Sequence, residues 1–125
     1  MKYLTPQNVI QIHFELVEET GGMQGLRDLG LLESAVLRPQ STFGGKDLYP
    51  GLAQKAAALV HSLLLNRVFA DGNKRTATIS MAEFLIINGK EFKATNKEIV
   101  DFALWVENKK PTIDKIAKWI REHTK

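Results

Sequence analysis

The centre of the chain, residues 52–87, reads LAQKAAALVHSLLLNRVFADGNKRTATISMAEFLII. Apolar side chains fall on every face of the segments 52–66 and 77–87, whereas residues 67–76 between them are mostly polar. Helices without a polar face lie in the middle of a bundle, where neighbouring helices cover them on all sides. The sequence therefore predicts two central helices joined by a polar segment at the rim of the core.

Helix start and stop signals on both sides of this centre predict further helices. Thr5 followed by Pro6 starts a helix that Gly21-Gly22 ends, and Asn88-Gly89 ends the second central helix. Residues 40–51 are irregular, and Gly44-Gly45 with an aromatic residue on each side indicates a short hairpin or mobile flap near 41–50. We expect the remaining helices over residues 6–20, 29–38 and 97–107 and, for the last one, after Pro111, with Pro39 closing the second of them.

The expected fold class is all-α, a compact bundle of about six to seven helices in a single domain over residues 1–125. The chain is 44% apolar and 25% charged, as is ordinary for a globular protein, and it has no cysteine, which excludes disulfides and thiolate catalysis. No apolar run is long enough to span a bilayer and no targeting signal is visible, so we expect no membrane partner. The absence of cysteine fits a cytoplasmic protein best. A net charge of +3 is too small to predict direct nucleic-acid binding.

The polar segment between the central helices has the composition of an anion site. Asp71-Gly72-Asn73 is a turn, and a helix that starts there would leave the N–H groups of Gly72, Asn73 and Lys74 free at its positive end. Lys74 and Arg75 add cations where the helix dipole disfavours them, which suggests an anionic partner such as phosphate. Asp71 would hold a magnesium ion between two phosphates. The plainer interpretation is a capping Asp71 beside solvated cations.

Residues 69–77, FADGNKRTA, resemble the Doc branch of the Fic/Doc family, whose signature is His, any residue, Phe, any residue, Asp or Asn, Gly or Ala, Asn, Lys, Arg. Segments 30–35, 38–40, 42–45 and 49–50 are also similar to family members of this length. The resemblance implies a death-on-curing toxin that transfers phosphate from ATP, with Mg²⁺, to a threonine of elongation factor Tu and so blocks translation. It also implies a cognate antitoxin with a disordered tail.

The resemblance assigns roles to single residues. Asp71 would position the metal or the attacking hydroxyl, and Gly72 and Asn73 would form the anion-binding turn. Lys74 and Arg75 would hold phosphates, and Lys74 favours the kinase over the nucleotidyl transferase (AMPylating) relatives. Phe69 would anchor the loop. The expected flap, beside which a target segment docks, contains Thr42, Phe43, Gly44 and Gly45.

Arg67 occupies the position of the catalytic histidine in the family signature. Arginine stays charged and has no lone pair, so it cannot replace a general base, and the chain is expected to be inactive or strongly impaired. His61 would lie roughly 9 Å from position 67, at about 1.5 Å per helical residue, and we expect structural or exposed roles for His13 and His123. Arg67 marks either a natural binding protein or a detoxified variant, and the intact phosphate residues favour the second.

Two other functions compete with the toxin kinase. The chain would be a non-catalytic module that binds a nucleotide or an antitoxin, which Arg67 favours, or a nucleotidyl transferase of the Fic type. The groove that an antitoxin tail would occupy is not identified by the sequence, although the first helix and the C-terminal helices are candidates on their amphipathic pattern.

Overall fold

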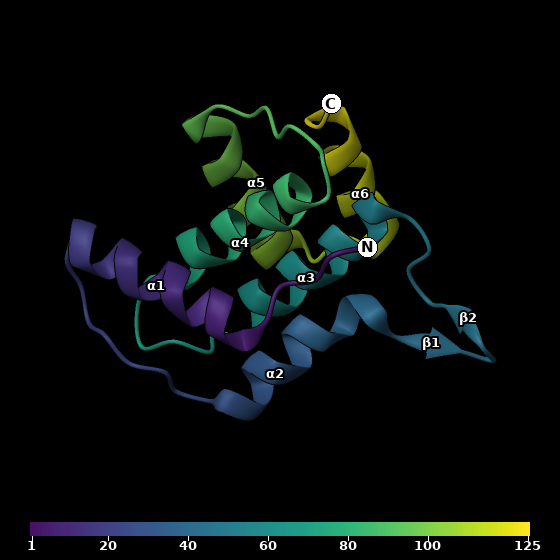
Figure 1. Cartoon of the computed structure of the whole chain (residues 1–125). Helices are drawn as coiled ribbons and strands as arrows, with labels where there is room; N and C mark the ends of the chain where they lie inside the picture. The colour runs from purple at the N-terminus through teal and green to yellow at the C-terminus, as the bar shows by residue number, and fades with distance from the viewer.

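The computed structural model describes residues 1–125 as six helices and one two-stranded antiparallel hairpin (Figure 1). The elements in chain order are α1 (Pro6–Thr20), α2 (Leu29–Leu37), a short 3₁₀ helix (Arg38–Gln40), β1 (Thr42–Phe43), β2 (Lys46–Asp47), α3 (Leu52–Asn66), α4 (Asn73–Ile87), α5 (Asn96–Lys109) and α6 (Ile113–Glu122). The predicted all-α bundle with a short hairpin is confirmed. No helix combines the length and the hydropathy that a bilayer-spanning segment requires.

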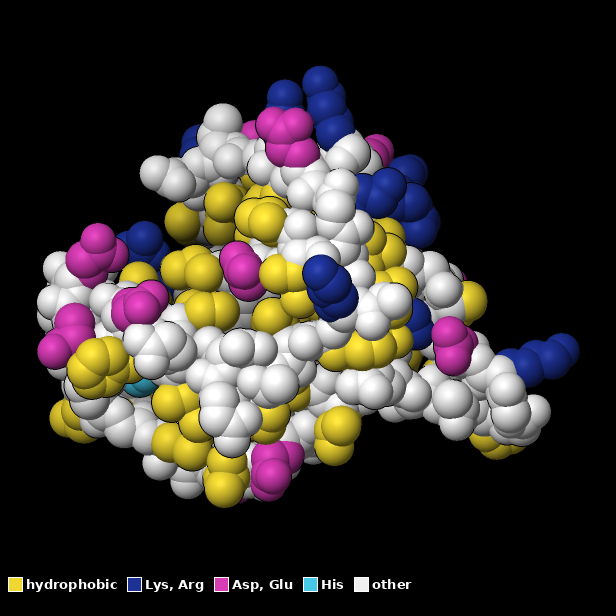
Figure 2. Space-filling view, in the orientation of Figure 1, with side chains coloured by type: hydrophobic (Ala, Val, Ile, Leu, Met, Phe, Trp, Pro, Cys, Tyr) yellow, Lys and Arg dark blue, Asp and Glu magenta, His cyan; other side chains and the backbone are white.

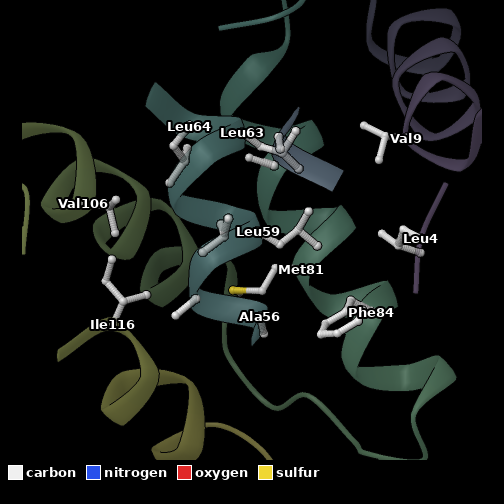
Figure 3. Packing of buried hydrophobic residues seen from close by; sticks show 14 of the residues in the cluster. Leu4, Val9, Ala56, Leu59, Leu63, Leu64, Met81, Phe84, Val106 and Ile116 are labelled. Carbon is white, nitrogen blue, oxygen red and sulfur yellow. The ribbon is translucent and has the colours of Figure 1, made fainter. Parts of the chain in front are cut away.

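Helix α3 is the central element of the bundle. It packs mainly against α4 and α6, and also against α2 and α5. From Lys55 to Leu64 every residue except His61 is buried, because neighbouring helices cover the alanines and leucines on all sides. Figure 3 shows Leu59 and Leu63 of this helix among Met81 and Phe84 of α4. The prediction of a central helix over residues 52–66 is confirmed.

Helix α4 differs from the expectation that it is covered on all sides. Ile79 is 37% exposed and Ile86 is 53% exposed, and apolar side chains are visible at the surface over this helix in Figure 2. The reason is that α4 packs on α3 and α1 with one side and makes only a sparse contact with α5 on the other. It is therefore an outer helix with an apolar surface, and only α3 is fully central.

The helix ends follow local chemistry. Thr5 accepts a hydrogen bond from the backbone of Asn8, Pro6 is the first helical residue, and Gly21 ends α1, as predicted. The second helix was expected to continue to Arg38, but it ends at Leu37. Arg38 and Pro39 instead tighten into the 3₁₀ turn, in which Pro39 is buried. This turn leads directly into the hairpin.

Candidate functional site

The segment between α3 and α4, residues 67–72, forms a loop bounded by two residues in left-handed backbone conformation. Arg67 ends α3 with φ 48° and ψ 58°, and Gly72 precedes α4 with φ 73°. Glycine adopts this conformation without cost, whereas an arginine does so only when its surroundings hold it there. We call residues 67–72, together with the first turn of α4, the motif loop.

The side chain of Asn73 holds the motif loop together. Its Oδ1 accepts a hydrogen bond from the backbone N–H of Phe69 at 2.9 Å, and its Nδ2 donates to the carbonyl of Phe69 at 2.9 Å. The amide therefore folds back onto the loop, and only the backbone N–H of Asn73 remains for an anion. Sequence reasoning predicted Asn73 at the anion-binding turn but did not predict this second role.

Phe69 and His13 form the floor below the motif loop. Phe69 is 2% exposed, and its ring stacks on the imidazole of His13 with centroids 3.8 Å apart and planes 6° from parallel. His13 Nε2 lies 2.7 Å from the carbonyl oxygen of Asp71. A carbonyl only accepts, so Nε2 carries the proton and donates. The structural role that the sequence predicted for Phe69 fits this burial, and the expected structural role of His13 is seen as a support of the loop.

A cavity of about 440 Å³ opens at the motif loop. Its lining residues are Arg27, Arg67, Ala70, Asp71, Gly72, Asn73, Lys74 and Arg75. All six residues predicted for catalysis and phosphate binding therefore line one cavity. It contains four cationic side chains and one carboxylate, which is the charge balance of a site for a highly charged anion.

Arg27 is the lining residue that sequence reasoning missed. It reaches the cavity because the link between α1 and α2 runs alongside the motif loop. The N–H of Arg27 donates to the carbonyl of Val68 at 2.7 Å, and the N–H of Ala70 donates to the carbonyl of Gly25 at 3.0 Å. Leu26 and Phe69 form an isolated antiparallel bridge between the same segments. No pattern in the sequence predicts this pairing, because the link has neither strand periodicity nor a motif.

The free N–H groups at the start of α4 are displaced by one residue from the prediction. Gly72 N–H was expected to be free, but it donates to Asp71 Oδ1 at 2.9 Å, so that prediction was wrong. The backbone N–H groups of Asn73, Lys74 and Arg75 have no hydrogen-bond partner. They lie at the positive end of the helix dipole, where backbone N–H groups bind phosphate oxygens.

Asp71 is the one carboxylate that lines the cavity. Its Oδ2 also accepts from the N–H of Met23 at 3.3 Å, and a Cβ atom on Gly22 would come within 2.7 Å of that oxygen. No group of three or more acidic or histidine side chains that could hold a metal is present. One carboxylate fits Mg²⁺ only when phosphate oxygens supply further ligands, so the residues fit a magnesium–nucleotide complex but not a free ion.

Glu107 of α5 lies next to two of the cations. Its Oε2 is 4.0 Å from Arg67 Nη2, and its Oε1 is 3.7 Å from Lys74 Nζ. Arg27 and Arg75 form no ion pair, so half of the cationic charge is left without a carboxylate partner. Sequence reasoning missed Glu107, because no motif in α5 points to this residue and the contact depends on how α5 packs.

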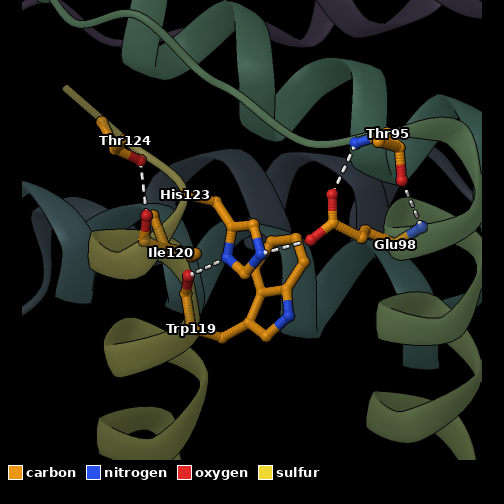
Figure 4. Close-up of polar contacts among 6 residues, drawn as sticks. All are labelled: Thr95, Glu98, Trp119, Ile120, His123 and Thr124. Atoms are coloured by element: carbon orange, nitrogen blue, oxygen red, sulfur yellow. Dashed lines mark hydrogen bonds and ion pairs between the residues drawn. The ribbon is translucent and has the colours of Figure 1, made fainter.

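None of the three histidines lines the cavity. His61 accepts from Arg38 Nη1 at 2.8 Å, and burial together with the Arg38 charge lowers the pKa of His61. His123 lies near the C-terminus, where its Nδ1 is 2.7 Å from the carbonyl of Trp119 and its Nε2 is 3.1 Å from Glu98 (Figure 4). Hydrogen bonds from the Thr95 backbone and from His123 lower the pKa of the Glu98 carboxyl.

The expected flap is the β1–β2 hairpin, in which Thr42 pairs with Asp47 and Phe43 pairs with Lys46. Gly44 and Gly45 turn the chain with φ 60° and 80°, values that favour glycine. Phe43 is 83% exposed. None of Thr42, Phe43, Gly44 and Gly45 lines the cavity, and the hairpin projects from the bundle on the side away from the motif loop (Figure 1). The structure therefore does not bring the flap and the cavity together.

A buried lysine attaches the hairpin to α3. Lys55 is 2% exposed, and its Nζ lies 3.1 Å from the carbonyl of Pro39 and 3.3 Å from Asp47 Oδ2. Arg38 donates to Tyr49 Oη at 3.0 Å and to Ser62 Oγ at 2.9 Å, which fixes the end of the same segment. Two cations therefore hold the residues on either side of the hairpin.

The two members of the Lys55–Asp47 pair are expected to respond differently to substitution. Asp47→Ala should lower the free energy of unfolding by about 1–3 kcal/mol, because a buried ammonium would retain only the Pro39 carbonyl. Lys55→Met removes the buried charge itself and should cost less than about 1.5 kcal/mol. Urea unfolding of both variants measures the difference. A larger loss in Lys55→Met than in Asp47→Ala would contradict the assignment of Lys55 as a charge that needs its partner.

Comparisons with known proteins identify the family of the chain. The family model described as "Fic/DOC family" matches residues 3–85. Toxin Doc of Mycolicibacterium smegmatis (strain ATCC 700084 / mc(2)155) is 53% identical over 74 residues, which are 59% of this chain and 57% of that protein. Protein kinase doc of Escherichia phage P1 is 25% identical over 121 residues, 97% of this chain and 94% of that protein. The first alignment thus spans little more than half of the mycobacterial toxin. Since the family model covers well over half of the chain and includes the motif loop, the chain belongs to the Fic/DOC family.

Proposed function

We propose that the chain is a toxin of the Doc type, built to transfer phosphate from ATP to a threonine of elongation factor Tu and so to block translation. The observation that supports this proposal most directly is the cavity at the start of α4, with its four cations, one carboxylate and three free N–H groups. The similarity to Toxin Doc and to Protein kinase doc supports the same reaction class. A single Fic/Doc domain over residues 1–125 and a location in the cytoplasm belong to the proposal.

The residues of the cavity suggest how the nucleotide is held. The N–H groups of Asn73, Lys74 and Arg75 would cradle one phosphate at the helix terminus. The guanidinium groups of Arg27 and Arg75 carry no ion pair and would each bind two phosphate oxygens, while Lys74 would act as a point charge. Asp71 would hold the magnesium ion of the nucleotide, and that ion would neutralise part of the charge on the phosphates.

Position 67 decides whether this site performs chemistry. A threonine hydroxyl must lose its proton to attack a phosphate, and Arg67 has no lone pair with which to accept it. No histidine lines the cavity in its place. We therefore propose that the chain as written binds the nucleotide but is catalytically silent or strongly impaired. The intact phosphate residues favour a detoxified variant over a natural binding protein.

Two alternatives remain within the family. A non-catalytic module that binds a nucleotide or an antitoxin is favoured by Arg67 itself, whereas a nucleotidyl transferase is disfavoured by Lys74, as its relatives more often carry glycine there. As a toxin, the chain would bind a cognate antitoxin whose disordered tail folds onto its surface. Growth of cells that express Arg67→His, measured with and without that antitoxin, separates a toxin from a binding module. Growth arrest that the antitoxin relieves indicates a toxin.

Nucleotide binding by the chain as written tests the phosphate site without catalysis. Isothermal titration calorimetry with ATP and Mg²⁺ is expected to show one site. Arg75→Ala and Arg27→Ala should each weaken it by about 10- to 100-fold, because hydrogen bonds to charged groups contribute about 1.5–3 kcal/mol. Lys118→Ala, which removes an exposed cation of α6, is the matched control and should bind as the parent does. Equal affinities for all four proteins would contradict the assignment of the cavity.

A further inference from the structure

Glu107 is more buried than the other acidic residues of this protein that form ion pairs. Its side chain is 15% exposed, whereas the other carboxylates in ion pairs are largely open to solvent, between 47% and 66% exposed. Its Oε1 is buried and has no hydrogen-bond partner. Residue 107 also lies outside the family match over residues 3–85, so neither the motif nor the comparison assigns it a role.

A buried carboxylate is unfavourable unless opposite charge compensates it. The compensation here comes from the motif loop, because Lys74 Nζ lies 3.7 Å from Oε1 and Arg67 Nη2 lies 4.0 Å from Oε2. Helix α5 fixes the carboxylate, whereas the side chains of Lys74 and Arg67 are 48% and 57% exposed. The glutamate is therefore the more buried partner, and the two cations are the more exposed partners.

The contact with Lys74 is an ion pair without a hydrogen bond. A distance of 3.7 Å exceeds that of a charge-assisted hydrogen bond, which is about 2.7–2.9 Å. All three N–H donors of the ammonium therefore remain available to a phosphate while the charge stays next to the carboxylate. A lysine that is restrained in this way loses less rotamer freedom when it binds phosphate than a lysine that is free in solvent.

We propose that Glu107 is a positioning residue, which holds the ammonium of Lys74 at the mouth of the phosphate cavity, and that Arg67 shares the same carboxylate. This inference rests on the proposed function, because it takes the phosphates of a nucleotide as the ligand of Lys74. Glu107 also has an effect that opposes binding, because its negative charge repels the phosphates. The charges of Lys74 and Arg67, which lie next to the carboxylate, offset that repulsion, so we expect the loss of positioning to dominate when the carboxylate is removed.

A double-mutant cycle tests the coupling in the chain as written. ATP with Mg²⁺ is titrated calorimetrically into the parent, Glu107→Gln, Lys74→Met and the double variant. Glu107→Gln is expected to weaken binding about tenfold, and to have less than about a twofold effect once Lys74 is methionine. Asp101→Asn is the matched control, because it removes an exposed carboxylate of the same helix that pairs only with Lys97, and it should bind as the parent does.

A second measurement follows Lys74 without a nucleotide. The lysine amines are ¹³C-methylated, and the NMR signal of Lys74 is compared between the parent and Glu107→Gln; it should move toward that of a solvated lysine only in the variant. Unchanged or tighter ATP binding in Glu107→Gln, additive losses in the cycle, or an unmoved Lys74 signal would overturn the positioning role. A parent that binds no ATP while the Lys74 signal still responds to Glu107→Gln would overturn the proposed function and leave the positioning intact.

Discussion

Replacing Arg67 by histidine is expected to convert the chain, which we propose to be silent as written, into a toxin. Phosphate transfer from ATP to elongation factor Tu should rise by about 10²–10⁴-fold, the range that a positioned general base contributes. The backbone accepts the change, since residue 67 is left-handed with φ 48°, a conformation in which histidine is enriched among non-glycine residues. Transfer of labelled phosphate in vitro and growth arrest under a tightly controlled promoter are the two measurements.

Two controls isolate the base from other effects of the substitution. Arg67→Gln removes the same charge without adding a base and should stay silent, which separates base catalysis from the release of Glu107. Asp71→Asn in the histidine background should reduce transfer, since it removes the one carboxylate of the cavity. The restored rate should also fall as the pH drops below about 6.5, where a free imidazole becomes protonated. No transfer and no growth arrest in Arg67→His would contradict the proposed function.

The sequence predicted the fold well because the decisive signals were local. Thr5 with Pro6, the glycine pair after α1 and the apolar segment 52–66 each specify a helix or its end without reference to the rest of the chain. The prediction was wrong for the outer face of α4, as the same apolar pattern is compatible with a covered helix or with an exposed apolar surface. Which of the two occurs depends on where α5 packs.

The residues of the candidate site also fall into those that a local pattern predicts and those that only tertiary packing places. Residues 67–75 are contiguous, so a motif could identify them and one loop brings them to one cavity. Glu107 comes from α5, His13 from α1 and Arg27 from the link after α1, and only tertiary packing places them at that loop. Asn73 is a further case, because a polar side chain beside a predicted anion site gives no indication that its amide is already bonded to Phe69.

Phe69→Ala is expected to have the largest effect on stability, lowering the free energy of unfolding by about 3–5 kcal/mol. The ring is 2% exposed and stacks on His13, so its removal leaves a cavity and ends an aromatic contact. Small domains are stable by only about 5–15 kcal/mol, and the loss is therefore a large fraction of the total. Urea unfolding followed by circular dichroism measures it.

Phe84→Ala provides a matched control for the role of Phe69 in the site. Phe84 is equally buried, at 1% exposed, and stacks on Tyr3 at the other end of α4. Its removal should cost a similar free energy of unfolding but should leave the motif loop in place. At a temperature where both variants are folded, Phe69→Ala should bind ATP more weakly than the parent, because the loop loses its floor, and Phe84→Ala should bind as the parent does. Equal affinities in the two variants would show that Phe69 supports the core without shaping the phosphate cavity.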